Sequence, residues 1–94
     1  MKENTADETW EIWFTRQAQK DFGRLAAAGL EGNARELLKV LKANPFQNPP
    51  PYEKLVGDLA GAYSRRLNVQ HRIIYVVGKE FKTVKIIRMW THYE

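Results

Sequence analysis

Two short runs of strand-forming residues, separated by only three residues, constrain the fold of this chain more than any other feature. Residues 63–67 read YSRRL, residues 71–77 read HRIIYVV, and the sequence NVQ lies between them. A connection of three residues is typical of a β-hairpin, so the two runs are predicted to pair as antiparallel strands. The chain is therefore expected to build its fold around this hairpin.

The predicted hairpin carries an excess of arginine. Arg65 and Arg66 lie on its first strand, Arg72 lies on its second, and Glu53 precedes it just after a run of three prolines. A guanidinium group binds an oxyanion such as phosphate through paired hydrogen bonds. Cationic side chains also keep an exposed sheet edge soluble. The residues alone leave both interpretations open.

The composition limits the classes of protein to which the chain can belong. Its 94 residues are enough for one domain with a modest core. It has no cysteine and two histidines, which excludes disulfides and thiolate sites and nearly excludes a multi-histidine metal site. No apolar run approaches the roughly 20 residues that span a bilayer, and no secretion signal is evident. A cytoplasmic protein without a membrane segment is expected.

The net charge of +4 is concentrated in the strand-rich half of the chain. Residues 65–94 hold seven Lys and Arg against two Glu, whereas residues 1–64 hold eight Lys and Arg against nine Asp and Glu. A cationic sheet attracts nucleic acid and also acidic protein segments. The charge pattern by itself does not decide between them.

Hydrophobic periodicity and turn residues predict the remaining elements. Residues 1–9 are polar and acidic and are expected to form a flexible extension to a single domain over 10–94. Thr15 is a plausible N-cap for the first helix and Gly29 a plausible end for it. The predicted elements are a strand at 10–14, helices at 16–28 and 30–43, and strands at 55–59, 63–67, 71–77 and 81–90.

Simple alternation along the last predicted strand assigns its residues to two faces. One face would carry Val84, Ile86, Arg88, Trp90 and His92. Met89 would lie on the other face. His71 and Arg72 would likewise point to opposite faces of their strand, and His71 is interpreted as structural.

Four blocks of sequence resemble the Txe/YoeB toxins of the RelE/ParE superfamily of bacterial toxin–antitoxin systems. These blocks are PPYEKL at 50–55, GAYSRRL at 61–67, HRIIY at 71–75 and RMWTHY at 88–93. The resemblance covers about residues 10–94. It implies an α+β fold in which an N-terminal strand and a helical hairpin pack on a twisted, mainly antiparallel sheet.

The resemblance also implies an activity, namely ribosome-dependent endonucleolytic cleavage of mRNA in the ribosomal A site. By position, Glu53 matches the general base, His92 the general acid and Arg72 the arginine that stabilises the transition state. Tyr93 matches an adjacent functional tyrosine. Because RNA supplies its own nucleophile, the 2′-OH, the reaction needs a base and an acid but no metal or other cofactor.

Three further cations near the predicted acid–base pair are candidate substrate contacts. They are Lys54, Arg65 and Arg66. The chain departs from several relatives at Val56, where they have a lysine, and this substitution puts one phosphate contact in doubt.

The resemblance implies a cognate antitoxin of the YefM/Axe type, whose acidic arm is expected to cover a groove lined by Arg65, Arg66 and Arg72. The ribosome and mRNA are the other expected partners, and a homodimer is possible within the family. Two alternative functions stay open: a gyrase-targeting toxin of the ParE branch, and a non-catalytic nucleic-acid-binding domain.

Overall fold

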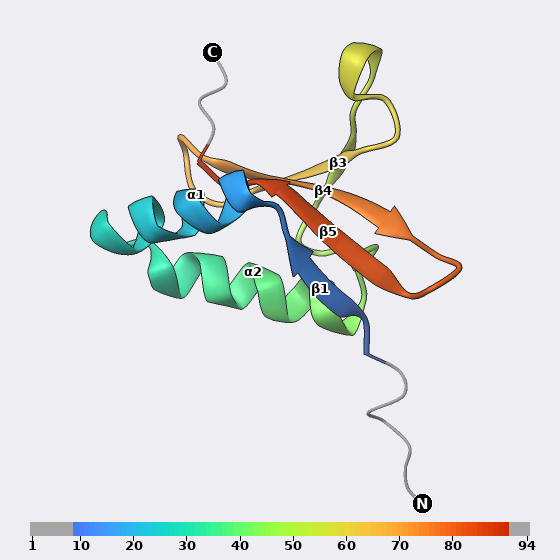
Figure 1. The fold of residues 1–94 in the computed structure, drawn as a ribbon, viewed down its shortest axis with the longest axis horizontal. Helices are drawn as coiled ribbons and strands as arrows, with labels where there is room; N and C mark the ends of the chain where they lie inside the picture. Colours follow the sequence, from blue (N-terminus) through green and yellow to red (C-terminus); the bar gives the residue numbers. More distant parts are fainter. Residues whose placement is uncertain (1–8, 91–94) are drawn as a thin grey trace, which may run out of the picture.

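Five strands form one mixed sheet in the order β1-β5-β4-β3-β2, in a computed structural model that describes residues 9–90 (Figure 1). Only β1 and β5 run parallel, and the other neighbouring strands are antiparallel. In chain order, the elements are β1 (Glu11–Phe14), α1 (Arg16–Ala27), α2 (Glu31–Ala43), β2 (Glu53–Lys54), the 3₁₀ helix η2 (Gly57–Leu59), β3 (Tyr63–Arg66), β4 (Arg72–Gly78) and β5 (Thr83–Arg88). The predicted α+β fold is confirmed.

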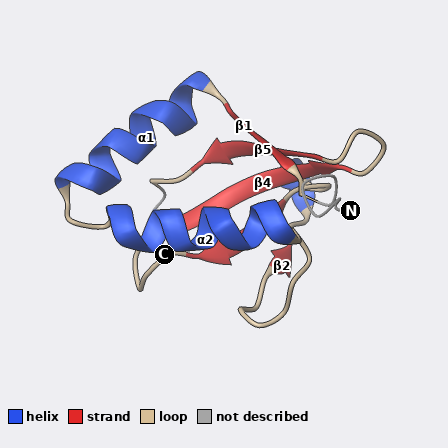
Figure 2. Cartoon of the chain, turned by 90° about the horizontal axis from the view of Figure 1, so that it is seen from below, coloured by secondary structure: helices blue, strands red, loops and turns tan. Residues whose placement is uncertain are grey.

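The two α-helices form a hairpin that covers one face of the sheet (Figures 1 and 2). The Thr15 hydroxyl caps α1 by accepting a hydrogen bond from the Ala18 amide at 3.0 Å, as the sequence predicts. Gly29 turns the chain between the helices with a φ of 80°, a left-handed conformation that suits glycine. Neither α-helix in the described part of the chain has the length and apolarity to cross a membrane.

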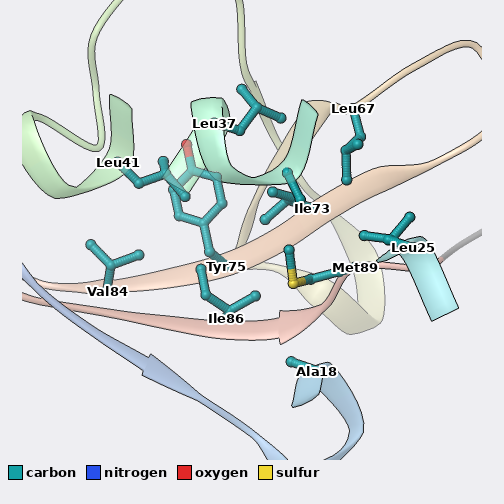
Figure 3. Packing of buried hydrophobic residues seen from close by; sticks show 11 residues of the cluster. Ala18, Leu25, Leu37, Leu41, Leu67, Ile73, Tyr75, Val84, Ile86 and Met89 are labelled. Atoms are coloured by element: carbon teal, nitrogen blue, oxygen red, sulfur yellow. The ribbon is translucent and has the colours of Figure 1, made fainter. Parts of the chain in front are cut away.

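The core lies between the helical hairpin and the central strands β4 and β5 (Figure 3). Alternation along β4 turns Ile73 and Tyr75 toward the helices, and Val84 and Ile86 face the same way from β5. The helices contribute small and aliphatic side chains at helical spacing, which are Ala18, Leu25, Ala34, Leu37 and Leu41. The predicted helical stripes are therefore core faces.

A buried arginine holds the proline-rich loop that follows α2. Arg65 is only 1% exposed, and its guanidinium donates to the carbonyl oxygens of Pro45, Gln47 and Pro50 at 2.7–3.0 Å. Its Nε also donates to the Tyr75 hydroxyl at 3.1 Å. Burial raises the pKa of Tyr75, so this phenol stays protonated and donates in turn to the Pro45 carbonyl at 3.0 Å.

The predicted strand at 55–59 is wrong. In this part of the chain the residues that pair with β3 are Glu53 and Lys54, two residues earlier than the predicted start. Gly57 then adopts a φ of 72°, which turns the chain out of an extended path and into η2. Val56 is 84% exposed as a result, so this segment projects from the sheet instead of extending it (Figure 1).

The last strand is shorter than predicted, and its alternation is interrupted. Tyr75 pairs with Ile86 and Ile74 pairs with Arg88, which leaves Ile87 as an extra residue in a β-bulge. The bulge shifts the side-chain parity, so Met89 is fully buried in the same core as Ile86. Alternation alone had placed Met89 on the opposite face.

β5 ends at Arg88 because a buried carboxylate captures the next two amides. Asp21 of α1 accepts from the Met89 amide at 2.9 Å, the Trp90 amide at 3.2 Å and Nε of Arg88 at 2.8 Å. Burial by itself raises the pKa of Asp21, but hydrogen bonds from Arg88, Met89, Gln17 and Trp90 outweigh burial and hold this pKa below its ordinary value. Asp21 is therefore charged near neutral pH.

The neighbouring arginines Arg65 and Arg66 are expected to differ sharply in their effect on stability. Arg65→Met should lower the free energy of unfolding by at least about 3 kcal/mol, because several buried carbonyls lose their donor. Arg66→Met removes an exposed side chain of the same length and should change stability by less than about 0.5 kcal/mol. Urea unfolding of both variants checks this, and equal losses would contradict the structural role of Arg65.

The stability contributed by Asp21 should depend on pH. Because its folded-state pKa is lowered, the contribution is complete above the ordinary carboxyl range and disappears as the pH falls through the lowered pKa. Asp21→Asn should therefore cost about 1.5–3 kcal/mol at pH 7 and progressively less in acid. Urea unfolding across the acid range measures the difference, with Glu31→Gln in an exposed ion pair as the control. A cost that stays constant with pH would rule out the charge-dependent contribution.

Candidate active site

The register of three strands brings Glu53 and Arg72 together on the sheet face opposite the helices. Glu53 of β2 pairs with Ser64 of β3, and Arg66 of β3 pairs with Arg72 of β4. Because Arg65 and Ile73 point toward the helical face, the residues that alternate with them point to the other face. Four side chains from three strands thus share one small area of the sheet.

The Arg72 guanidinium bridges the Glu53 carboxylate and the Ser64 hydroxyl. Its Nη1 lies 3.4 Å from Oε1 of Glu53 and 3.1 Å from the buried Oγ of Ser64. A pocket of about 120 Å³ is lined by Glu53, Leu55, Ser64 and Arg72. An adjoining pocket of about 200 Å³ shares Glu53, Ser64 and Arg72 and is also lined by Pro51, Tyr52 and Arg66.

The ion pair in this pocket is loose. The Glu53 side chain is 65% exposed while that of Arg72 is 19% exposed, and a solvent-accessible pair of this kind contributes at most about 1 kcal/mol. An incoming anion could therefore take the place of Glu53 on the guanidinium at little cost. The site can bind an oxyanion between Arg66 and Arg72 while leaving a carboxylate beside it to accept a proton.

The other predicted site residues differ in where they lie relative to the two pockets. Arg66 is exposed and lines the second pocket, whereas Lys54 lines neither pocket. Arg65 is buried and lines neither pocket, and its guanidinium donates to loop carbonyls, so its predicted role as a substrate contact is wrong. The predicted acid His92 and the adjacent Tyr93 lie outside the described residues. Within residues 9–90, no three His, Asp or Glu side chains gather into a cluster that could hold a metal ion.

Sequence reasoning missed two polar residues that organise the site. Ser64 orients Arg72, and its hydroxyl gave no signal beyond its place in the strand. Asp21 holds the segment that leads toward the C-terminus, and here a signal existed. Asp21 lies three residues after Ala18 and four before Leu25, both buried, so it is a carboxylate on an apolar helical stripe.

The described segment that leads toward His92 is held by aromatic contacts as well as by Asp21. The Trp90 ring stacks on His71 with centroids 4.1 Å apart, and the Arg24 guanidinium lies 4.7 Å from the centroid of the Trp90 ring. His71 directly precedes Arg72 along the chain. The segment therefore passes next to the strand that carries the anion-binding arginine.

Comparison with known proteins finds relatives that match most of this chain. Residues 14–93 match the model of the YoeB-like toxin of bacterial type II toxin–antitoxin systems. Toxin YoeB of Synechocystis sp. is 28% identical over 83 residues, covering 88% of this chain and 84% of that protein. The YoeB/ParE toxin from Agrobacterium tumefaciens is 27% identical with a TM-score of 0.79, covering 88% of this chain and 99% of its own.

A third relative has been solved in more than one assembly. The Staphylococcus aureus protein of a YoeB–YefM complex is 32% identical with a TM-score of 0.75, over 89% of this chain and 98% of its own, and a YoeB dimer from the same organism gives the same values. The family match spans most of the sequence, including the strands that build the pocket. This chain therefore belongs to the YoeB-like toxins of bacterial type II toxin–antitoxin systems.

Proposed function

We propose that this toxin is a metal-independent endoribonuclease that cleaves mRNA in the ribosomal A site and so inhibits translation in the cytoplasm. The observation that carries the proposal is the placement of an exposed carboxylate, Glu53, within 3.4 Å of the Arg72 guanidinium in a pocket. A proton acceptor beside an anion-binding group is what transesterification of RNA requires.

Five of the predicted site residues have a part in the proposed reaction. Glu53 takes the proton of the 2′-OH, and the freed oxygen forms a bond to the adjacent phosphorus. Arg72, assisted by Arg66, stabilises the charge that grows on the phosphate oxygens. The bond from phosphorus to the 5′-oxygen then breaks, and His92 gives a proton to that oxygen. Tyr93 is proposed as a neighbouring contact to the substrate.

The size of the pocket favours a substrate that another surface holds in place. The two adjoining pockets, of about 120 and 200 Å³, are small beside a long stretch of RNA, so most of a message would lie outside them. Positioning the 2′-OH in line with the bond to be broken can supply several kcal/mol of the barrier reduction. The ribosome is proposed to hold the message in that geometry.

A substrate that lacks the nucleophile tests the mechanism directly. An mRNA with one 2′-deoxy nucleotide immediately 5′ of the cut bond, placed in the A site of purified ribosomes, should not be cleaved at that bond. The unmodified message should give one fragment with a 5′-OH and another with a 2′,3′-cyclic phosphate or 3′-phosphate. Glu53→Gln should slow cleavage of the unmodified message by about 10²–10⁴-fold, because the base is lost. Gel analysis of end-labelled fragments measures all three results.

The control variant is Asp58→Asn, which neutralises another exposed carboxylate outside both pockets and should cleave at the normal rate. Cleavage of the deoxy message at the same bond and rate would refute the 2′-OH mechanism. An uncut message with translation spared in a cell-free extract would instead favour a gyrase-targeting toxin.

The proposed partner is an antitoxin with an acidic, amphipathic arm that orders on binding. A YefM-type partner is supported by the complex known for the Staphylococcus aureus relative, and the YoeB dimer from that organism supports a homodimer as a further possible assembly. Arg66 and Arg72 carry the positive charge at the pocket, since Arg65 is buried. We propose that the arm covers these two arginines and blocks the pocket.

Salt should weaken this association mainly through the on-rate, since exposed charges steer the approach of an acidic partner. Arg66→Gln should lower the on-rate at low salt and reduce its salt dependence. Lys20→Gln removes the same charge from the exposed side of α1 and should leave both quantities unchanged. Stopped-flow measurements at several ionic strengths check this, and an on-rate independent of salt would contradict the electrostatic account.

A further inference from the structure

One buried carboxylate binds three consecutive residues just before the predicted general acid. Asp21 is 0% exposed and accepts hydrogen bonds from the Arg88 side chain and from the amides of Met89 and Trp90, all within 3.2 Å. Arg88 closes the arrangement, since its Nη2 donates to the Trp90 carbonyl at 3.1 Å. Such hydrogen bonds to a charged acceptor are about twice as strong as neutral ones.

The Trp90 side chain fixes the same segment from a second direction. Its ring lies between His71, stacked at 4.1 Å between centroids, and Arg24, whose guanidinium is 4.7 Å from the ring centroid. His71 is 2% exposed and adjoins Arg72 in sequence, so this contact ties the segment to the pocket strand. Contacts therefore hold both the backbone and the side chain of Trp90 in place.

These contacts limit where the general acid can act. His92 is two residues beyond Trp90, and two residues span at most about 7 Å even when fully extended. A displacement of Trp90 would move the start of that short connection by the same amount. Misplacing a reacting group by about 1 Å can cost about 10²-fold in rate.

We propose that Asp21 is a positioning residue for the general acid, acting by anchoring residues 88–90 so that His92 reaches the leaving oxygen. This inference rests on the proposed nuclease function. Asp21 itself lies in α1 on the helical side of the sheet and does not touch the pocket that Glu53 and Arg72 line. Its effect on catalysis would therefore be confined to the step that needs the acid.

A change of leaving atom isolates that step. When sulfur replaces the 5′-oxygen at the cut bond, the departing group is a thiolate, which is far less basic than an alkoxide and leaves without being protonated. The attack by the 2′-oxygen still needs Glu53. A defect in the acid, or in its placement, should then largely disappear on the sulfur substrate, whereas a defect in the base should remain.

The experiment compares initial rates on ribosomes carrying either message, with the full-length toxin and its variants. Asp21→Asn keeps the shape of the side chain and removes its charge. We expect it to cleave the oxygen message about 10²-fold more slowly than the wild type, with unchanged dependence on ribosome concentration. On the sulfur message it should approach the wild-type rate, as should His92→Gln. Glu53→Gln should stay slow on both, and Glu31→Gln should match the wild type on both.

The outcomes separate the two proposals. If the wild type cuts neither message, or if His92→Gln shows no defect relieved by sulfur, the proposed function or its acid assignment fails. If those controls behave as expected but folded Asp21→Asn is equally slow on both messages, Asp21 matters only for the amount of active protein, and the inference is overturned. Full activity of folded Asp21→Asn on the oxygen message overturns it as well.

A second variant covers the case in which Asp21→Asn does not fold. Arg24 is an exposed residue of α1 whose guanidinium lies over the Trp90 ring, so Arg24→Ala should leave the fold intact while loosening the same segment. It should show a smaller defect that sulfur again relieves. No defect, or a defect of the same size on both messages, would overturn the inference.

Discussion

The structure depends on a buried guanidinium group more than on any single apolar contact. Removing the Arg65 charge from water costs several kcal/mol unless hydrogen bonds replace the lost hydration. Three loop carbonyls and the Tyr75 hydroxyl supply those bonds, and in return the loop between α2 and β2 is fixed. Since β2 contains only Glu53 and Lys54, this loop largely decides where Glu53 stands relative to Arg72.

Asp21 fixes the segment that leads toward His92, much as Arg65 fixes the loop that leads to Glu53. Each is a buried ion whose partners include the backbone of an irregular segment, and each segment leads to a residue of the proposed acid–base pair. Backbone groups outside helices and strands need partners when they are buried. Here charged side chains of the neighbouring elements provide them, and the site is assembled from segments that have little regular structure of their own.

Periodicity was sufficient to predict the helices, the central hairpin and the general order of the fold. It could not distinguish Arg65 from Arg66, because neighbouring residues on a strand differ only in the face to which they point, and that face depends on register. The same limit explains why Met89 was predicted on the wrong face. The extra residue Ile87 reverses the alternation of side chains between the two faces for the residues that follow it. The prediction of a strand at 55–59 was wrong for a local reason. It relied on the apolar residues of this segment and did not allow for a turn at Gly57.

For the candidate site, the resemblance to the toxin family supplied residue types and the structure supplied their relations. Glu53, Arg66 and Arg72 meet because three strands pair in one register, which no short motif encodes. Ser64 and Asp21 act on other residues of the site and not through a chemistry visible in the sequence. Residues of this supporting kind are found only when the partners of each functional side chain are known.

The parallel pairing of β1 with β5 has a consequence for how the protein is made. Thr15, at the end of β1, donates its hydroxyl proton to the carbonyl of Ile87, a contact between residues 72 positions apart. During synthesis the first strand must wait for the later elements of the described chain before it can pair with β5, its neighbour in the sheet. Contacts between such distant residues form slowly, because a long loop must close first. The nascent chain thus stays incomplete until β5 has been made, so the sheet of the described residues closes only with the last of its strands in chain order.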